Sequence, residues 1–152
     1  SYVNKNKFKL TFIGDGPEKE KMENLINSCQ LSNVILTGFL NSIVDEIINH
    51  QILVMPSHTE GLPMTLIECA SLGMPVIATD VGAISSIVVN NNNGILLTKN
   101  DESSWHQAFD QMLTNYNEYF AKAQEKSTYI QDKYSRKNWS QSTISIYNKI
   151  LN

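Results

Sequence analysis

The sequence has no excess of positive charge and no long apolar run, and each absence excludes a class of protein. Lysine and arginine number 12 against 15 aspartate and glutamate residues, so the net charge is −3. This balance predicts no basic face for nucleic acid. The longest apolar stretches, such as "QILVMP" and "GILL", are far too short to span a bilayer. We therefore expect no nucleic-acid partner and at most peripheral contact with a membrane.

Cysteine is also scarce, and no signal sequence opens the chain. Cys29 and Cys69 lie in apolar helical patterns that predict burial, and no CxxC spacing or disulfide framework is present. A reducing, cytoplasmic setting is expected, peripheral at most to the inner face of the membrane. The opening "SYVNKNKFKL" lacks an apolar core and a small-residue cleavage site, so it does not resemble a signal peptide. The chain is expected to be cut from a longer protein.

The 152 residues, 41% apolar and 18% charged, are typical of one soluble domain with a single core. Short apolar runs alternate with longer periodic stretches. Strands are predicted over 8–14, 33–38, 52–57, 75–80 and 95–98, and helices over 17–29, 43–50 and 63–73, with Pro17 and Pro63 at first helical positions and Gly73 as a C-terminal stop. This order favours an α/β, Rossmann-like parallel sheet with helices on both faces.

From residue 101 onward the pattern predicts helices only. Asp101 is placed as a cap before an apolar stripe that runs to Leu113, and further helices are predicted over 117–134 and 135–151. The last of these carries Trp139 and Tyr147 on one stripe. The four asparagines at 90–93 predict a solvated turn.

Two carboxylates lie around the third predicted helix. Glu68 is on the face opposite Leu66, Cys69 and Ala70, and helical side chains lean toward the N-terminus, so its carboxylate reaches back toward the loop that holds Glu60. Both acids are expected to border one crevice at the carboxyl end of a parallel strand, where open α/β sheets bind ligands. The helix N-terminus would attract a phosphate, and the carboxylate could accept hydrogen bonds from a vicinal diol such as ribose.

Each of these residues also has a purely structural interpretation. A glutamate early in a helix is often only a favourable partner of the helix dipole, and a loop glutamate is often a surface residue. "GDGP" (14–17) lacks the third glycine of the dinucleotide-binding motif and could be a tight turn. His58 is interpreted as a loop residue without a catalytic role. Taken singly, none of these residues identifies a function.

The longer stretch "PSHTEGLPMTLIECASLGMPVIATDVG" resembles the donor-binding motif of retaining glycosyltransferases of the group 1, or family 4, type, in which two glutamates are separated by seven residues. The resemblance extends from "LTFIGDGPEKEKMENLI" through "NVILTGFL" to "GILLTKND" and the closing helix. It implies the C-terminal half of the two-domain GT-B fold. Residues 1–152 would then form one nucleotide-sugar-binding domain that lacks the N-terminal acceptor domain and its own first strand.

The resemblance also implies roles for individual residues. Glu60 would contact sugar hydroxyls near the reacting carbon and is the expected catalytic residue, whereas Glu68 would bind the ribose hydroxyls. The rest of the expected nucleotide-sugar site comprises Gly61, Leu62, Met64, Thr65, Gly14, Gly16, Phe39 and Leu40. The chain departs from the family at Pro63, where many members have glycine and where proline offers no N–H. The family's basic diphosphate ligands would precede residue 1, and "SYVNKNK" does not supply them.

The implied function is transfer of a sugar from a nucleotide-diphosphate donor to an acceptor hydroxyl with retention of configuration, in glycan or polysaccharide synthesis. The acceptor, a glycan or lipid-linked sugar, would bind through the missing N-terminal domain, so the isolated chain is expected to be inactive. No cofactor and no metal are expected, because no Asp-x-Asp pair or His/Asp cluster is visible. Two alternatives stay open: a GT-B-like sugar-nucleotide epimerase or phosphorylase domain, and a non-catalytic scaffold domain.

Overall fold

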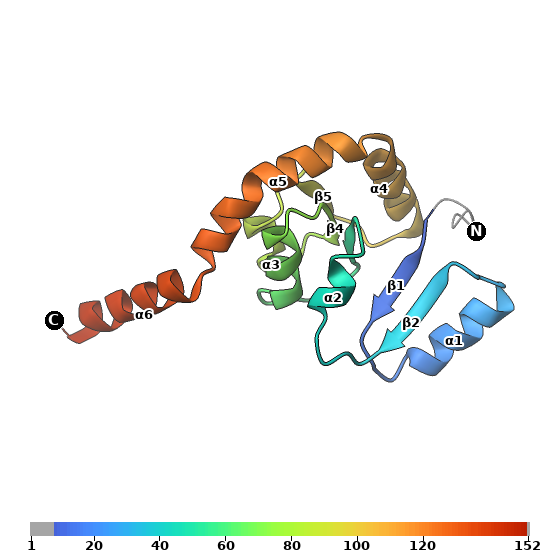
Figure 1. The fold of residues 1–152 in the computed structure, drawn as a ribbon, viewed down its shortest axis with the longest axis horizontal. Coiled ribbons are helices and arrows are strands. Elements are labelled where there is room, and N and C mark those ends of the chain that lie inside the picture. Colours follow the sequence, from blue (N-terminus) through green and yellow to red (C-terminus); the bar gives the residue numbers. More distant parts are fainter. Residues whose placement is uncertain (1–7, 152) are drawn as a thin grey trace. The chain divides into compact units, whose positions relative to one another are not determined.

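The computed structural model describes residues 8–151. Residues 1–7, where we expected neither a leader nor a basic diphosphate-binding pattern, lie outside this range. The chain divides into two compact parts, the first ending at Asn49 and the second beginning at His50 (Figure 1). Each part is described by itself.

The first part contains two strand-helix units. Its elements are β1 (Leu10–Ile13), α1 (Lys19–Ser28), β2 (Val34–Gly38) and α2 (Val44–Ile47). β1 and β2 pair in parallel, with Leu10 opposite Val34. Helix α1 begins later than Pro17 suggested, because the Lys19 N–H donates to the Gly16 carbonyl at 3.2 Å and residues 16–19 therefore form a turn.

The second part is larger and has a parallel sheet of its own. The strand order is β3-β4-β5, with Val54 opposite Ile77 and Ile77 opposite Ile95. Its elements are β3 (Leu53–Met55), α3 (Met64–Ser71), β4 (Val76–Thr79), a 3₁₀ turn (Ile84–Ser86), β5 (Gly94–Leu97), α4 (Glu102–Thr114), α5 (Tyr116–Lys133) and α6 (Arg136–Leu151). The predicted α/β, Rossmann-like class and its closing helices are confirmed, and the parallel strands form two hydrogen-bonded sheets.

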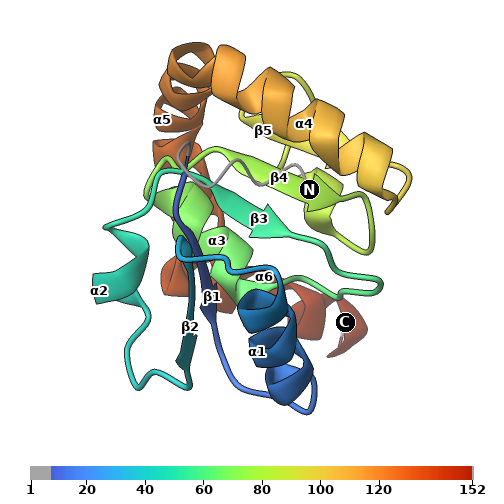
Figure 2. The same ribbon diagram turned by 90° about the vertical axis from the view of Figure 1, so that its right-hand side faces the viewer.

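Strand β4 is buried on both faces. Val76 and Ala78 pack into one apolar cluster with residues of α3 and with Ile130 of α5. Ile77 points to the opposite face, into a second cluster that includes Met112 of α4. Figure 2 shows α3 and α4 on the two sides of the strands. A strand covered on both faces needs an uninterrupted apolar run, which is why "PVIAT" does not alternate with polar residues.

Helix α5 holds the end of α3. The Gln124 side-chain amide donates to the carbonyls of Leu72 and Gly73 at 3.0 and 3.3 Å, and the Gln131 amide donates to the Ser71 carbonyl at 2.6 Å. These bonds satisfy carbonyls that the end of a helix leaves unpaired. Gly73 has φ +72°, so the predicted glycine stop is confirmed.

The asparagine turn differs from our prediction in one residue. Asn91 is exposed and adopts φ +56°, but Asn93 is only 1% exposed. The Asn93 side chain accepts a hydrogen bond from the Val89 N–H at 2.7 Å and donates one to the Ile87 carbonyl at 3.1 Å. The turn is therefore built around a buried amide, and the prediction of a wholly solvated turn was wrong.

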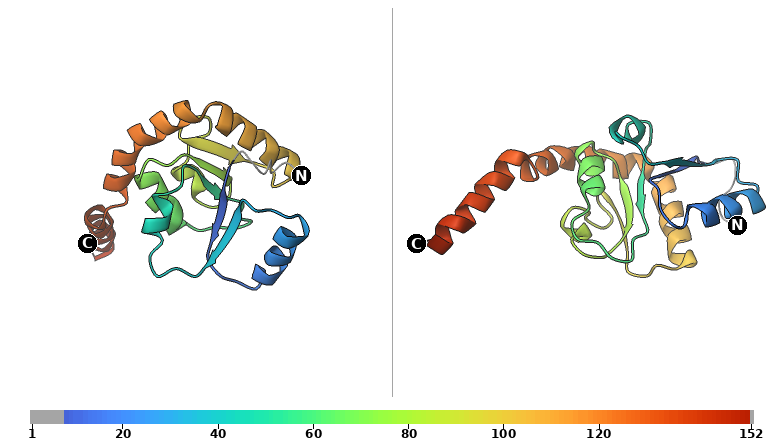
Figure 3. Two further views of the ribbon diagram at one scale, coloured as in Figure 1. Left: turned by 45° about the vertical axis from the view of Figure 1, so that its right-hand side comes forward. Right: turned by 90° about the horizontal axis from the view of Figure 1, so that it is seen from below.

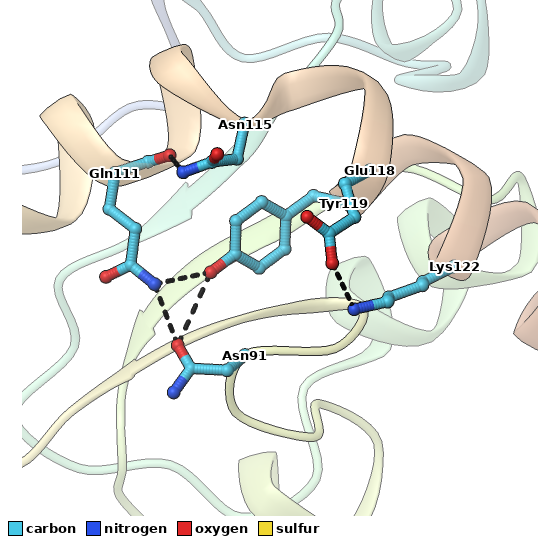
Figure 4. Close-up of polar contacts among 6 residues, drawn as sticks. All are labelled: Asn91, Gln111, Asn115, Glu118, Tyr119 and Lys122. Atoms are coloured by element: carbon cyan, nitrogen blue, oxygen red, sulfur yellow. Dashed lines mark hydrogen bonds and ion pairs between the residues drawn. The ribbon is translucent and has the colours of Figure 1, made fainter.

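A polar cluster joins this turn to the junction of α4 and α5 (Figure 4). The Gln111 amide donates to the Tyr119 hydroxyl at 2.6 Å and to Asn91 Oδ1 at 2.8 Å. Lys122 pairs with Glu118 at 2.6 Å beside them. Because Tyr119 is buried, its hydroxyl needs such partners. The cluster fixes α5 against the start of β5.

The ends of the last helices behave differently. Asp101 caps α4 as predicted: its Oδ1 accepts a hydrogen bond from the Ser104 N–H at 2.8 Å, and bonds to Ser104 lower the pKa of its carboxyl. Helix α6, by contrast, extends away from the three-stranded sheet (Figure 3) and buries none of its residues. Trp139 and Tyr147 are 71% and 63% exposed.

None of the helices described between residues 8 and 151 is long and apolar enough to cross a membrane.

The two cysteines differ in burial. Cys69, on the inner face of α3, is buried as predicted, but Cys29 is exposed. Cys29 is the residue that follows the last turn of α1, a helix that buries none of its residues. The two strands and two short helices described between residues 8 and 49 form too small a core to enclose a thiol at a helix end.

The difference between α5 and α6 predicts a difference in stability. Ile130→Ala should lower the free energy of unfolding by about 2–5 kcal/mol, since it removes a side chain from the core cluster. Ile146→Ala, on the exposed face of α6, should change it by less than about 0.5 kcal/mol. Urea unfolding followed by circular dichroism measures both. Equal effects of the two substitutions would contradict the difference in packing.

The buried thiol predicts a pH dependence. Burial, followed by the charge of Glu68, raises the pKa of Cys69 to about 11. In the unfolded chain the pKa of a thiol is about 8.5. Between these values the unfolded chain loses a proton that the folded chain keeps, so stability should fall as pH rises, by at most about 1.4 kcal/mol per pH unit.

The free energy of unfolding is measured at pH 8 and at pH 10.5 for the unsubstituted protein and for Cys69→Ala, and the difference between the two proteins isolates this contribution.

The burial of Cys69 also predicts a difference in thiol reactivity. In the unsubstituted protein at pH 8, iodoacetamide should modify the exposed Cys29 and leave Cys69 intact until denaturant is added. Modification of both thiols at similar rates without denaturant would show that Cys69 is accessible.

Candidate functional site

The loop after β3 carries Glu60 at the carboxyl end of the three-stranded sheet. Glu60 is half-buried, and its Oε1 accepts a hydrogen bond from the Ser57 hydroxyl at 2.7 Å. A carboxylate oxygen can accept more than one hydrogen bond, so the Glu60 carboxylate keeps acceptor capacity for a ligand. His58, to which we assigned no catalytic role, is exposed in the same loop.

Thr79, the last residue of β4, supports the start of this loop. Its side-chain hydroxyl donates to the Ser57 carbonyl at 2.5 Å, and the Met55 carbonyl lies 3.4 Å from the same oxygen. Thr79 is 3% exposed, so water does not compete for these contacts. The carboxyl ends of β3 and β4 are thereby joined through the Thr79 side chain as well as through the strand ladder.

The segment after β4 supports the end of the loop. Gly82 has φ +58°, and a Cβ there would overlap the Glu60 carbonyl oxygen. Next to it, the Ala83 N–H donates to the Gly61 carbonyl at 2.9 Å. Glycine is required at residue 82 both by its backbone conformation and by the close approach of the Glu60 backbone.

Helix α3 begins beside this loop with free backbone donors. Pro63 is the N-cap residue, with extended backbone (ψ 124°), so Met64 rather than Pro63 is the first helical residue. Among the described residues, no side chain caps this end of the helix. The N–H groups of Met64, Thr65 and Leu66 lack intrahelical acceptors, as in any first turn. Together with the helix dipole they favour an anion.

Glu68 lies one turn further along α3, on its outer face. It is exposed, whereas Leu66, Cys69 and Ala70 are buried, so the predicted division of the helix faces is confirmed. The side chain leans toward the start of the helix, as helical side chains do. Gly61, Leu62, Met64 and Thr65 are all exposed between the two glutamates, and Leu62 and Met64 present apolar surface there.

The remaining predicted site residues lie in the first part of the chain. The Gly14 N–H donates to the Gly38 carbonyl at 3.0 Å, which brings the 14–16 turn beside the segment that begins with Phe39. Phe39 is 76% exposed, Leu40 is half-buried and Gly16 is exposed. The structure thus assembles the predicted residues as two groups, one in each part of the chain.

Three polar residues at these strand ends were not predicted from the sequence. Ser57 and Thr79 hold the Glu60 loop, and Lys19 in the first part pairs with Asp15 at 3.8 Å close to Gly38. A serine three residues before a loop glutamate is a weak signal for such a contact. The partner of Thr79 is 22 residues away in the sequence, and no local pattern encodes it.

Carboxylates and histidines do not gather into a metal centre in the part of the chain that the structure describes. No group of three or more His, Cys, Asp and Glu side chains between residues 8 and 151 is arranged to hold an ion. Among the described residues at this sheet edge, the groups that can contact a ligand are the carboxylates of Glu60 and Glu68 and the amides at the start of α3.

Comparison with known proteins identifies the family of the chain. Residues 2–130 match the family of group 1 glycosyl transferases. The 2-deoxystreptamine N-acetyl-D-glucosaminyltransferase of Niallia circulans is 36% identical over 111 residues, which cover 70% of this chain and 28% of that protein. The putative teichuronic acid biosynthesis glycosyltransferase of Bacillus subtilis strain 168 is 31% identical over 110 residues, 71% of this chain and 25% of that protein.

The fold is also found among solved structures. HepE from Anabaena, crystallised in complex with UDP, superposes with a TM-score of 0.82 at 17% identity, over 93% of this chain and 41% of that one. This chain therefore spans less than half of the length of each of these three proteins. Its fold is that of one half of a GT-B enzyme, and the chain belongs to the group 1 glycosyl transferases.

Proposed function

We propose that this chain is the donor-binding domain of a retaining glycosyltransferase. The observation that carries the proposal is the arrangement at the carboxyl end of β3, where Glu60 in the loop and Glu68 on the outer face of α3 flank an uncapped helix N-terminus. The donor would be a nucleoside diphosphate sugar. Two relatives support this class: one is named as an N-acetylglucosaminyltransferase, and HepE was crystallised with UDP.

Each group in the site suits one part of such a donor. The Glu68 carboxylate can accept hydrogen bonds from both hydroxyls of a ribose. The free amides at the start of α3, from Met64 and Thr65, suit the diphosphate. The half-buried Glu60 carboxylate would then accept hydrogen bonds from the transferred sugar. For the first part of the chain, the expected contacts of Phe39 and Leu40 with the base, and of Gly14 and Gly16 with the donor, stay predictions.

The reaction would replace the bond between the anomeric carbon and the diphosphate with a bond to the acceptor oxygen. We favour attack on the donor's own face, in which the leaving diphosphate takes the acceptor's proton and leaves with the bonding electron pair. No second carboxylate placed as a nucleophile is apparent between residues 8 and 151, so a covalent intermediate is not proposed. The N-terminus of α3 would stabilise the charge that develops on the diphosphate.

The acceptor, a glycan or a lipid-linked sugar, would be held by a second domain. The two curated relatives are about four times as long as the segment they share with this chain. We assign the exposed stripe of α6, with Trp139 and Tyr147, to contact with that domain. The name of the B. subtilis relative supports a role in polysaccharide synthesis. Two cysteines without a disulfide suit the cytoplasm, with peripheral membrane contact at most.

The chain alone is proposed to fold but to transfer no sugar. Holding donor and acceptor in the reactive geometry contributes about 7–11 kcal/mol to lowering the barrier, and the acceptor would have no binding site on this chain alone. Nucleotide binding by the chain alone should be no tighter than about millimolar, which corresponds to about −4 kcal/mol. Assays of transfer therefore require a protein that carries both domains.

Substitution of the two glutamates tests the proposal. In the two-domain protein, Glu68→Ala should weaken nucleotide-sugar binding by about 1–3 kcal/mol, because a charged hydrogen-bonding group is lost. Glu60→Ala should lower turnover more than binding. Calorimetry gives the dissociation constant, and transfer assayed over a panel of UDP- and GDP-sugars gives turnover. Glu125→Ala, on the exposed face of α5, is the matched control and should alter neither. Normal turnover of a stable Glu60→Ala protein would refute the role of Glu60.

Transfer should also be independent of a divalent metal. The sequence has no Asp-x-Asp pair near the site, and the start of α3 can meet the diphosphate charge. Activity in EDTA should therefore match activity in untreated buffer. Loss of transfer in EDTA, followed by recovery with magnesium or manganese, would contradict the metal-independent mechanism.

A further inference from the structure

We propose that Ser57 is a positioning residue for Glu60, and that Thr79 fixes Ser57 in turn. The inference rests on the proposed function, because it concerns the carboxylate assigned to the donor sugar. Its direct basis is the hydrogen bond of 2.7 Å from the Ser57 hydroxyl to Glu60 Oε1. The contact spans three residues within one loop, so the loop itself determines where the carboxylate lies.

The Ser57 backbone is fixed from the neighbouring strand. Thr79 is buried, so its hydroxyl hydrogen must be used within the protein. The carbonyl of Ser57, at 2.5 Å, is nearer to the Thr79 hydroxyl than the Met55 carbonyl at 3.4 Å, and it is the better acceptor. A buried strand therefore fixes the residue that holds Glu60.

The backbone of Glu60 is fixed independently on its other side. The absence of a Cβ at Gly82 lets the Glu60 carbonyl pack against that segment, and the Ala83 N–H holds the next carbonyl along the loop. With the backbone held at both ends, the freedom that remains belongs to the Glu60 side chain. A glutamate side chain loses substantial rotamer entropy when it is ordered. The Ser57 hydroxyl orders this side chain before any donor arrives.

This order should affect turnover rather than nucleotide binding. Oε2 of Glu60, and the remaining lone pair of Oε1, are left for hydroxyls of the sugar. A displacement of about 1 Å in a positioning group can lower a rate by about 100-fold. The nucleotide, in contrast, is assigned to Glu68 and the start of α3, which make no hydrogen bond to Ser57 among the described residues. Loss of the Ser57 hydroxyl should therefore separate kcat from the affinity for the nucleotide.

The test uses the two-domain protein and the donor selected from the panel of UDP- and GDP-sugars. Ser57→Ala should lower kcat by about 10- to 100-fold and change the dissociation constant of UDP or GDP by less than about 3-fold. Ser57→Thr keeps the hydroxyl and should restore most of the turnover. Thr79→Val removes the supporting hydroxyl at nearly constant shape, and should lower kcat in the same direction. Ser127→Ala is the control, since that hydroxyl bonds the Gln124 carbonyl at 2.7 Å within α5.

A double-mutant cycle decides whether Ser57 acts through Glu60. If it does, Ser57→Ala should lower the turnover of the Glu60→Ala protein no further, since the group it positions is already gone. If the losses of kcat caused by Ser57→Ala and Glu60→Ala multiply in the double variant, the proposal is overturned. A Ser57→Ala protein with a turnover within about 2-fold of the unsubstituted protein would also overturn it. Full turnover of Glu60→Ala would instead refute the role that the proposed function gives to Glu60, so the two failures are distinguishable.

Protein stability is followed in parallel by thermal unfolding. A purely structural role for Ser57 predicts that Ser57→Ala lowers the melting temperature and weakens nucleotide binding together with kcat. That outcome would also overturn the proposal. If Ser57→Ala folds poorly, Thr79→Val and the rescue by Ser57→Thr provide the same comparison of kcat with nucleotide affinity.

Discussion

Burial of β4 on both faces is the constraint on which the second part of the chain depends. Val76, Ile77 and Ala78 are completely buried, and they point alternately into a cluster with α3 and α5 and a cluster with α4. Apolar burial contributes about 25 cal/mol per Å² of surface removed from water, so a strand buried on two faces is a rigid support. Thr79, the last residue of that strand, extends this support to the loop that carries Glu60, because its hydroxyl donates a hydrogen bond to the Ser57 carbonyl.

The candidate site follows from this arrangement. Parallel strands end at the same edge, so the loops after β3 and β4 meet there, and α3 starts where the loop after β3 ends. The contact at Gly82 and the hydrogen bond from Ala83 fix that loop without using any group that a donor would need. Functional side chains on a supported loop keep their geometry, which is what a transition state requires of them.

Much of this was predictable from local patterns. Periodicity gave the order of strands and helices, the outer face of Glu68 on α3, the cap at Asp101 and the glycine stop at Gly73, because each depends on neighbours within one or two turns. The hydrogen bonds of Thr79 and the burial of Asn93 were not predicted, since they join segments that only the tertiary fold brings together. Cys29 was placed wrongly for the related reason that a helical apolar stripe shows which side is apolar, not whether a core covers it.

The first turn of α3 and Glu68 are proposed to bind the phosphates and the ribose of a nucleotide, and this binding can be measured on the chain itself. The experiment is titration of the ¹⁵N-labelled chain with UDP and GDP, followed by NMR, with uridine as the ligand without phosphate. We expect chemical-shift changes at the amides of Gly61, Met64, Thr65 and Leu66 at about millimolar nucleotide, and much smaller changes with uridine. Unchanged amides in this segment at nucleotide concentrations well above the millimolar range would contradict the proposed binding.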